Sequence, residues 1–250
     1  MACCENPGDV IASTTVPDST LTPAAPTTGD DSVAPAPAYS AEDYEIEIPP
    51  PAAADDAPFV DRLARIVNEV YVEAEAGIWR DGYQRTSAAE VAELIRAGEL
   101  AVAYLVNGNS NSGSISNKSD TNDDKHNDVT RSQPQPRPIG CVCIKKLLAG
   151  EEKGEFGMLA LDAAYRGGGL GRALVRFAED LCRGRGLTTM QVELLFPTAF
   201  EHAFKARLQR WYARMGYGKV RLGSFADDFP CLAPLLAGPC EYRIFEKRLV

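Results

Sequence analysis

Apolar and polar residues alternate along the chain with two different periods, which divide it into predicted strands and helices. A period of two predicts strands, and a period near 3.6 predicts amphipathic helices. By this rule we expect strands at 44–48, 99–106, 138–147, 155–161, 188–196, 218–222 and 241–249. We expect helices at 87–98, 170–181 and 200–215, and a further helix that is capped by Asp55 or Asp56. The pattern therefore predicts an α/β protein with a mixed sheet of about seven strands.

A glycine-rich turn joins the predicted strand that ends at Leu161 to the helix that begins near Leu170. The unpaired backbone N–H groups and the positive dipole of a helix N-terminus favour a phosphate group there. The Mg-nucleotide pattern does not fit, because Arg172 and Ala173 follow Gly171. The dinucleotide pattern does not fit either, because Leu174 stands where its third glycine belongs. The turn is thus a phosphate site of another class.

Two segments together resemble one known family. Arg166-x-x-Gly169-x-Gly171, directly after an apolar strand, resembles motif A of the GNAT superfamily of N-acetyltransferases. Residues 211–217, Trp-Tyr-Ala-Arg-Met-Gly-Tyr, resemble its motif B, and their glycine suits a left-handed helix cap. The resemblance covers residues 44–250. It implies a GNAT-like, mostly antiparallel sheet with a central splayed parallel pair, flanked by helices, and acetyl-CoA as acyl donor.

The resemblance also implies which residues bind cofactor and acceptor. The pantetheine arm would add to the sheet edge like an extra strand, and the pyrophosphate would bind the glycine-rich turn. The cofactor-binding residues expected from this are Leu159, Ala160, Leu161, Arg166, Gly167, Gly168, Gly169, Leu170, Gly171 and Arg172. The aromatic segment near residue 80 would overhang the acceptor, so we expect Trp79 and Tyr83 in the substrate wall. The alternative is that Trp79 only fills the core.

Three side chains are candidates for catalysis. Tyr212 matches the superfamily tyrosine that protonates the leaving thiolate; alternatively its ring only anchors the helix. Glu155 stands eleven residues before Arg166, the place of the general base in the histone-acetylating branch, or it is only an exposed residue at a strand start. Glu193 alternates with apolar neighbours on the next strand and could face the acceptor amine instead. Motif B lacks its frequent asparagine here.

Charge and composition predict how the chain is divided into a tail, a domain and an insertion. Residues 1–61 hold 12 of the 35 acidic residues and none of the 26 Lys and Arg, which leaves a net charge of +3 for the rest. We expect residues 1–40 to be a disordered acidic tail rich in Ala, Pro and Thr, and 41–250 to be a single acetyltransferase domain. Residues 107–137 are Asn- and Ser-rich, which predicts a disordered insertion at a hairpin tip.

The composition argues against nucleic acid, membrane and metal as partners, so we expect none of them. The sequence has no face of basic and aromatic residues that would predict nucleic-acid binding, and no apolar run long enough to predict a membrane span. Neither histidine has a partner at the spacing of a metal site. An odd number of cysteines, seven, favours a reducing compartment, so we expect a cytoplasmic protein, with the nucleus as an alternative. We expect a monomer or a homodimer.

The function implied is acetyl transfer from acetyl-CoA to a primary amine by direct transfer in a ternary complex. A small-molecule amine is the first choice of acceptor, because acidic site residues suit a cationic group. Acetylation of protein lysines or N-termini is the alternative within the same chemistry. A catalytically silent acyl-CoA sensor or scaffold is the alternative from another class.

Overall fold

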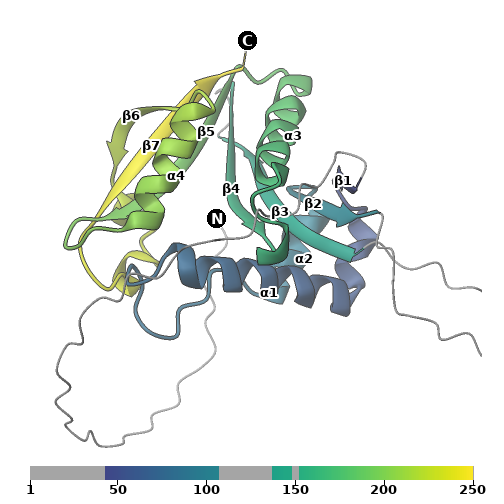
Figure 1. Ribbon diagram of the computed structural model, residues 1–250, viewed down its shortest axis with the longest axis horizontal. Helices are drawn as coiled ribbons and strands as arrows, with labels where there is room; N and C mark the ends of the chain where they lie inside the picture. The colour runs from purple at the N-terminus through teal and green to yellow at the C-terminus, as the bar shows by residue number, and fades with distance from the viewer. Residues whose placement is uncertain (1–42, 107–136, 148–151, 250) are drawn as a thin grey trace, which may run out of the picture. The chain divides into compact units, whose positions relative to one another are not determined.

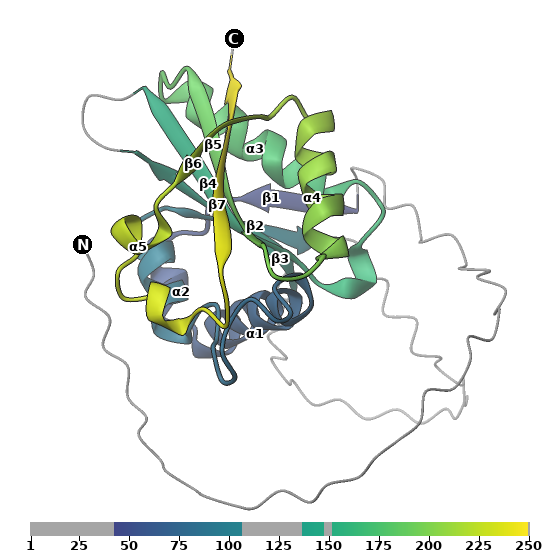
Figure 2. The same ribbon diagram turned by 90° about the vertical axis from the view of Figure 1, so that its left-hand side faces the viewer.

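Seven strands form one mixed sheet in the computed structural model, which describes residues 43–106, 137–147 and 152–249. Their order is β1-β2-β3-β4-β5-β7-β6 (Figures 1 and 2). The strands are β1 (Tyr44–Glu47), β2 (Leu100–Leu105), β3 (Arg137–Lys146), β4 (Lys153–Leu161), β5 (Thr189–Pro197), β6 (Gly218–Gly223) and β7 (Cys240–Arg248). Every neighbouring pair is antiparallel except β4 and β5. The predicted seven-stranded sheet with a central parallel pair is therefore confirmed.

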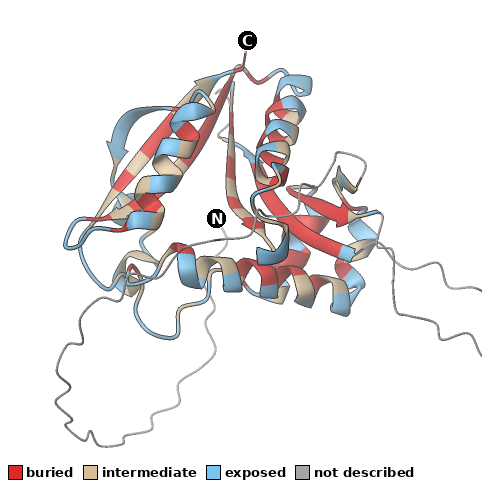
Figure 3. Cartoon of the chain, in the orientation of Figure 1, coloured by how far each residue is buried: buried red, intermediate tan, exposed pale blue. Residues whose placement is uncertain are grey.

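Helices cover both faces of the β2–β4 part of the sheet. The helices are α1 (Ala57–Ala74), α2 (Ala88–Arg96), α3 (Leu170–Gly184), α4 (Ala203–Arg214) and α5 (Phe225–Asp228), with short 3-10 turns at Pro51–Asp55, Ala163–Tyr165 and Ala233–Leu235. One apolar cluster joins α1 and α2 to this part of the sheet, and another joins α3 to it. Side chains on both faces of β3 are accordingly buried (Figure 3).

The helix boundaries follow from capping residues that are visible in the sequence. Asp56 caps α1 by accepting a hydrogen bond from the Phe59 N–H at 3.2 Å. Ser87 caps α2 by accepting from the Glu90 N–H at 3.1 Å. The Glu90 carboxylate accepts from the Thr86 hydroxyl at 2.9 Å. The helix predicted at 200–215 begins three residues later than expected, at Ala203.

The two central strands diverge, and this divergence positions the site. β4 pairs with β5 only where Lys153–Glu155 lie beside Thr189–Gln191, although both strands continue well beyond that point (Figure 1). A register shift in the β3–β4 pairing coincides with Met158, whose φ of 48° is left-handed. Such a bulge bends a strand away from its regular path. The facing edges of β4 and β5 therefore part after Glu155.

The predicted tail and insertion lie outside the described residues, apart from Arg137, which begins β3. Among the residues that the structure describes, no helix is long and apolar enough to cross a membrane. In the same residues no cluster of three or more His, Cys, Asp or Glu side chains is arranged to hold a metal ion.

Candidate active site

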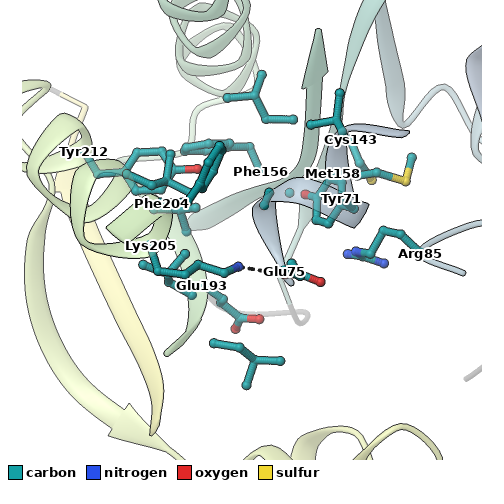
Figure 4. A pocket seen from close by; sticks show the side chains of 18 of the residues that line it. Tyr71, Glu75, Arg85, Cys143, Phe156, Met158, Glu193, Phe204, Lys205 and Tyr212 are labelled. Atoms are coloured by element: carbon teal, nitrogen blue, oxygen red, sulfur yellow. Dashed lines mark hydrogen bonds and ion pairs between the residues drawn. The ribbon is translucent and has the colours of Figure 1, made fainter. Parts of the chain in front are cut away.

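A cavity of about 630 Å³ lies between the parted strands, within the size range of roughly 300–1,000 Å³ of small-molecule sites. β4 and β5 form its walls together with α1, α4, the α1–α2 connection and the β6–β7 connection. Figure 4 shows Tyr212 and Phe204 on one side of it and Tyr71 and Arg85 on the other. The cavity is lined by nine of the residues predicted from the sequence: Trp79, Tyr83, Glu155, Leu159, Leu161, Arg166, Gly171, Glu193 and Tyr212.

The glycine-rich turn has the backbone conformation that its sequence predicts. Gly167 and Gly169 have φ values of 89° and 91°, a region that residues with a Cβ rarely adopt. Gly169 is the N-cap of α3, and no side chain caps the first turn of that helix. A Cβ added at Gly169 would meet no atom within 4 Å. The turn therefore offers open backbone N–H groups to an anion.

The remaining predicted cofactor residues lie around this turn in different ways. Gly168, Gly169 and Arg172 line a second, shallower hollow beside β1. Ala160 and Leu170 are buried in the core, so that only their backbone groups face a ligand. The described structure thus brings some of these side chains to the main cavity and leaves others outside it.

Arg166 and Lys205 are both engaged by carboxylates. Arg166 Nη1 pairs with Glu73 Oε2 at 2.6 Å, near the surface. Lys205 Nζ pairs with Glu75 Oε1 at 2.8 Å, and both side chains are buried. The other oxygen of Glu75 accepts from Trp79 Nε1 at 2.6 Å. Glu75 therefore ties α4 to the aromatic segment after α1, and Trp79 serves packing as well as the cavity wall.

Glu155 and Glu193 face the same cavity and share one hydrogen-bond donor. Gln191 Nε2 donates to Glu155 Oε2 at 3.2 Å and to Glu193 Oε1 at 2.9 Å. Among the described residues, no cation lies within ion-pair distance of either carboxylate. Burial, followed by the charge of Glu193, raises the pKa of Glu155 to about 7. Burial also raises the pKa of Glu193. The pair can therefore take up a proton near neutral pH.

Tyr212 presents a proton donor at the opposite side. Its ring packs edge-on against Phe156, with centroids 5.8 Å apart, and the residue lines the cavity. Burial raises the pKa of the Tyr212 hydroxyl, which therefore stays protonated. Its hydroxyl has no hydrogen-bond partner within the described part of the chain. Position and protonation state both suit a general acid.

Aromatic side chains form the far end of the cavity. Trp79 and Tyr83 stack with ring centroids 4.0 Å apart, and Phe225 meets Trp79 edge-on at 6.0 Å. Backbone hydrogen bonds of 2.9 Å, Arg80 N–H to Leu235 and Ala237 N–H to Ile78, join the α1–α2 and β6–β7 connections there. The two connections thus form one continuous wall.

Three groups of this site were not predicted from the sequence: Gln191, Arg85 and Tyr242. Gln191 lies two residues before Glu193 and opposite Glu155 in the β4–β5 ladder, so strand alternation would have found it. Arg85 and Tyr242 come from a loop and a distant strand. No local pattern indicates that either of them reaches the cavity.

Comparison with known proteins supports one family. The profile of the Acetyltransferase (GNAT) family matches residues 118–217, which include the glycine-rich turn and the helix that carries Tyr212. This match supports a GNAT superfamily acetyltransferase that uses acetyl-CoA. A search of curated proteins finds no match to this chain.

One solved N-acetyltransferase structure shares the fold of this chain, and two further structures resemble it less closely. PaiA N-acetyltransferase from Thermoplasma acidophilum, in complex with coenzyme A, superimposes with a TM-score of 0.51 at 15% identity, over 82% of this chain and 98% of that one. N-acetylglutamate synthase from Neisseria gonorrhoeae, complexed with coenzyme A and N-acetyl-glutamate, has a TM-score of 0.47 at 17% identity, over 83% of this chain and 35% of that one. The ribosomal-protein-S18-alanine N-acetyltransferase from Escherichia coli has a TM-score of 0.47 at 13% identity, over 82% of this chain and 94% of that one.

Proposed function

We propose that this GNAT acetyltransferase moves an acetyl group from acetyl-CoA to the primary amine of a small molecule, by direct transfer in a ternary complex. The observation that carries the proposal is the carboxylate pair Glu155 and Glu193, which faces the same cavity as the Tyr212 hydroxyl. The pair supplies a base, and the hydroxyl supplies an acid. Acetyl-CoA is already an activated thioester, so alignment of the two reactants provides much of the remaining catalysis.

The cofactor is assigned to the parted edge of β4 and the glycine-rich turn. The pyrophosphate would bind the backbone N–H groups of residues 167–171, with Arg166 and Arg172 as cationic neighbours. The pantetheine arm would pair with the free edge of β4 at Leu159 and Leu161. Ala160 and Leu170 would contribute only backbone groups, because their side chains are buried.

The proposed reaction balances with these groups alone. The ammonium form of the acceptor gives a proton to the Glu155–Glu193 pair, and the free amine nitrogen attacks the thioester carbonyl carbon. The new C–N bond forms as the C–S bond breaks, and the departing thiolate takes the proton of Tyr212. The second proton of the nitrogen is lost as the amide forms and restores the Tyr212 hydroxyl, so the products are the amide, CoA thiol and one proton held by the carboxylate pair.

A small-molecule acceptor is favoured over a protein segment by the continuous wall at the aromatic end. The connections that carry Trp79 and Leu236 form a backbone bridge there, which would leave no open groove for a polypeptide on that side. A silent acyl-CoA sensor is disfavoured, because such a protein has no use for two carboxylates of raised pKa beside a thioester site.

A thiol-release assay tests this function directly. We expect CoA production from acetyl-CoA to depend on an added small primary amine and to rise in proportion to enzyme. Acetylation of peptide lysines or peptide N-termini at a higher kcat/KM than any small amine would overturn the choice of acceptor. Absence of thiol release with every amine and peptide, in protein whose melting temperature acetyl-CoA still raises, would favour the sensor instead.

A further inference from the structure

Arg85 is a cation of the acceptor end that has no direct ion pair among the described residues. It lies between α1 and α2, lines the cavity and is half-buried (Figure 4). Its guanidinium lies 5.2 Å from the centre of the Tyr71 ring. Tyr71, Glu75, Tyr83 and Glu90 all lie near enough to favour its charged form. In the described residues no carboxylate comes within ion-pair distance of it, whereas Lys205 and Arg166 each have one.

A guanidinium that has no direct ion pair in this position can bind an anionic ligand. Desolvation of a charge costs free energy unless an opposite charge or several hydrogen bonds compensate for it. The planar guanidinium matches a carboxylate with two parallel hydrogen bonds. Stacking on the Tyr71 ring restrains the side chain, so less of its freedom remains to be lost on binding. Arg85 is thus built to receive a carboxylate.

The surroundings of Arg85 define two more features of the acceptor. Phe225 packs on Phe229 at 5.0 Å and on Tyr242 at 5.5 Å, which extends the aromatic wall formed by Trp79 and Tyr83. Such a wall suits a large apolar or aromatic group. The buried Tyr242 hydroxyl also lines the cavity. It lies close to Glu193, where an amine would bind.

The anion-binding and amine-binding groups line one cavity. Arg85 faces it from the α1–α2 connection, and Glu155 and Glu193 face it from β4 and β5. A single small molecule that carries both a carboxylate and an amine, as an amino acid does, can therefore meet both groups.

We infer that the acceptor is a free α-amino acid with an aromatic or large apolar side chain, whose carboxylate binds Arg85 while its amine faces Glu155 and Glu193. This inference rests on the proposed N-acetyltransferase function. A polyamine would meet Arg85 and Lys145 with like charge. The N-terminus of a protein lacks the carboxylate, because its first residue is joined to the next by a peptide bond.

The test compares acceptors that differ only in the carboxylate, in the thiol-release assay with the full chain. Phenylalanine, tryptophan and leucine are compared with phenethylamine, tryptamine and phenylalanine amide. We expect kcat/KM to be about 100-fold higher for phenylalanine than for phenethylamine, because a charge-assisted bidentate contact is lost. Arg85→Gln should lower kcat/KM for phenylalanine about 100-fold, mainly through KM, and so should remove the preference over phenethylamine. Arg85→Lys keeps the charge but not the planar guanidinium, so its kcat/KM for phenylalanine should lie between those of the wild type and Arg85→Gln.

Arg65→Gln is the matched control, because Arg65 is an exposed arginine of α1 outside the cavity, and it should leave both rates unchanged. Equal rates for phenylalanine and phenethylamine in the wild type, or an unchanged preference in folded Arg85→Gln, would overturn the inference and leave the proposed function standing. Acetylation of none of these compounds, with peptides acetylated instead, would overturn both.

Discussion

Two regions of the molecule hold carboxylates away from bulk solvent and treat them in opposite ways. Glu179 of α3 is fully buried, and its oxygens accept from Lys247 Nζ and from the Tyr217 hydroxyl, each at 2.8 Å. Glu155 and Glu193 are half-buried at the cavity, and within the described chain they share the neutral amide of Gln191 as a side-chain donor. The more deeply buried carboxylate is therefore the better compensated one.

The difference separates a structural carboxylate from a chemical one. A buried charge with a cation and a hydroxyl around it joins α3 to β7 and to the end of α4. Two carboxylates without a cation favour the neutral form, which costs stability when both are charged and makes them able to accept a proton. A fold tolerates such a pair where the pair has a chemical use.

Tyr217 and Tyr212 differ in the same way, since one has a structural partner and the other lines the cavity. Tyr217 and Tyr212 both pack edge-on against Phe156, at 5.6 Å and 5.8 Å. The hydroxyl of Tyr217 is bound by Glu179, whereas Tyr212 belongs to the cavity wall. Each tyrosine is thus a control for the other.

The largest expected effect is on stability and comes from Glu179→Gln. Removal of this charge leaves Lys247 without its carboxylate in a mostly buried site, which costs about 3–5 kcal/mol when a buried pair is broken. Urea denaturation should show a loss of unfolding free energy in that range. The matched variant Glu193→Gln should lose less than 1 kcal/mol. Similar losses for the two variants would contradict the distinction between these carboxylates.

A smaller effect, about 100-fold in turnover, is expected from Tyr212→Phe. This change removes the proton donor for the leaving thiolate while the ring remains against Phe156. Its stability should change by no more than about 1 kcal/mol. Tyr217→Phe should show the reverse, with unfolding free energy lowered by about 1–3 kcal/mol and turnover retained. Steady-state kinetics and denaturation of both variants would settle the assignment, and full turnover in Tyr212→Phe would refute it.

The smallest effect is the pH dependence of stability in Glu155→Gln. The folded-state pKa of Glu155 is raised, so its contribution is fully present below the unfolded value of about 4.5 and is lost as pH rises through about 7. The variant lacks this titration. Between pH 5 and 8 the wild type should therefore lose roughly 2 kcal/mol of unfolding free energy that Glu155→Gln does not lose, so the difference between the two proteins should shift by that amount in favour of the variant. A constant difference across this window would mean that the carboxyl group titrates normally.

Sequence patterns predicted the framework better than the site. The strand, glycine-rich turn and helix around Arg166 form one local unit, so periodicity and turn residues were sufficient to locate it. Glu155 and Glu193 were each plausible bases, but the sequence could not show that they act as a pair, because this depends on how β4 pairs with β5. The sequence could not show for a similar reason that Arg85 faces the cavity without a direct ion pair in the described chain. Its neighbours come from segments that only the tertiary fold brings together.

The most direct test of the central claim, that the carboxylate pair is the base for acetyl transfer, is the pH profile of kcat at saturating acceptor. For the wild type we expect kcat to rise with pH through an apparent value near 7 that belongs to the pair as a whole. For Glu155→Gln we expect a kcat about 100-fold lower at pH 8 and no step near pH 7. A variant that keeps both the wild-type rate and the wild-type step would contradict the claim.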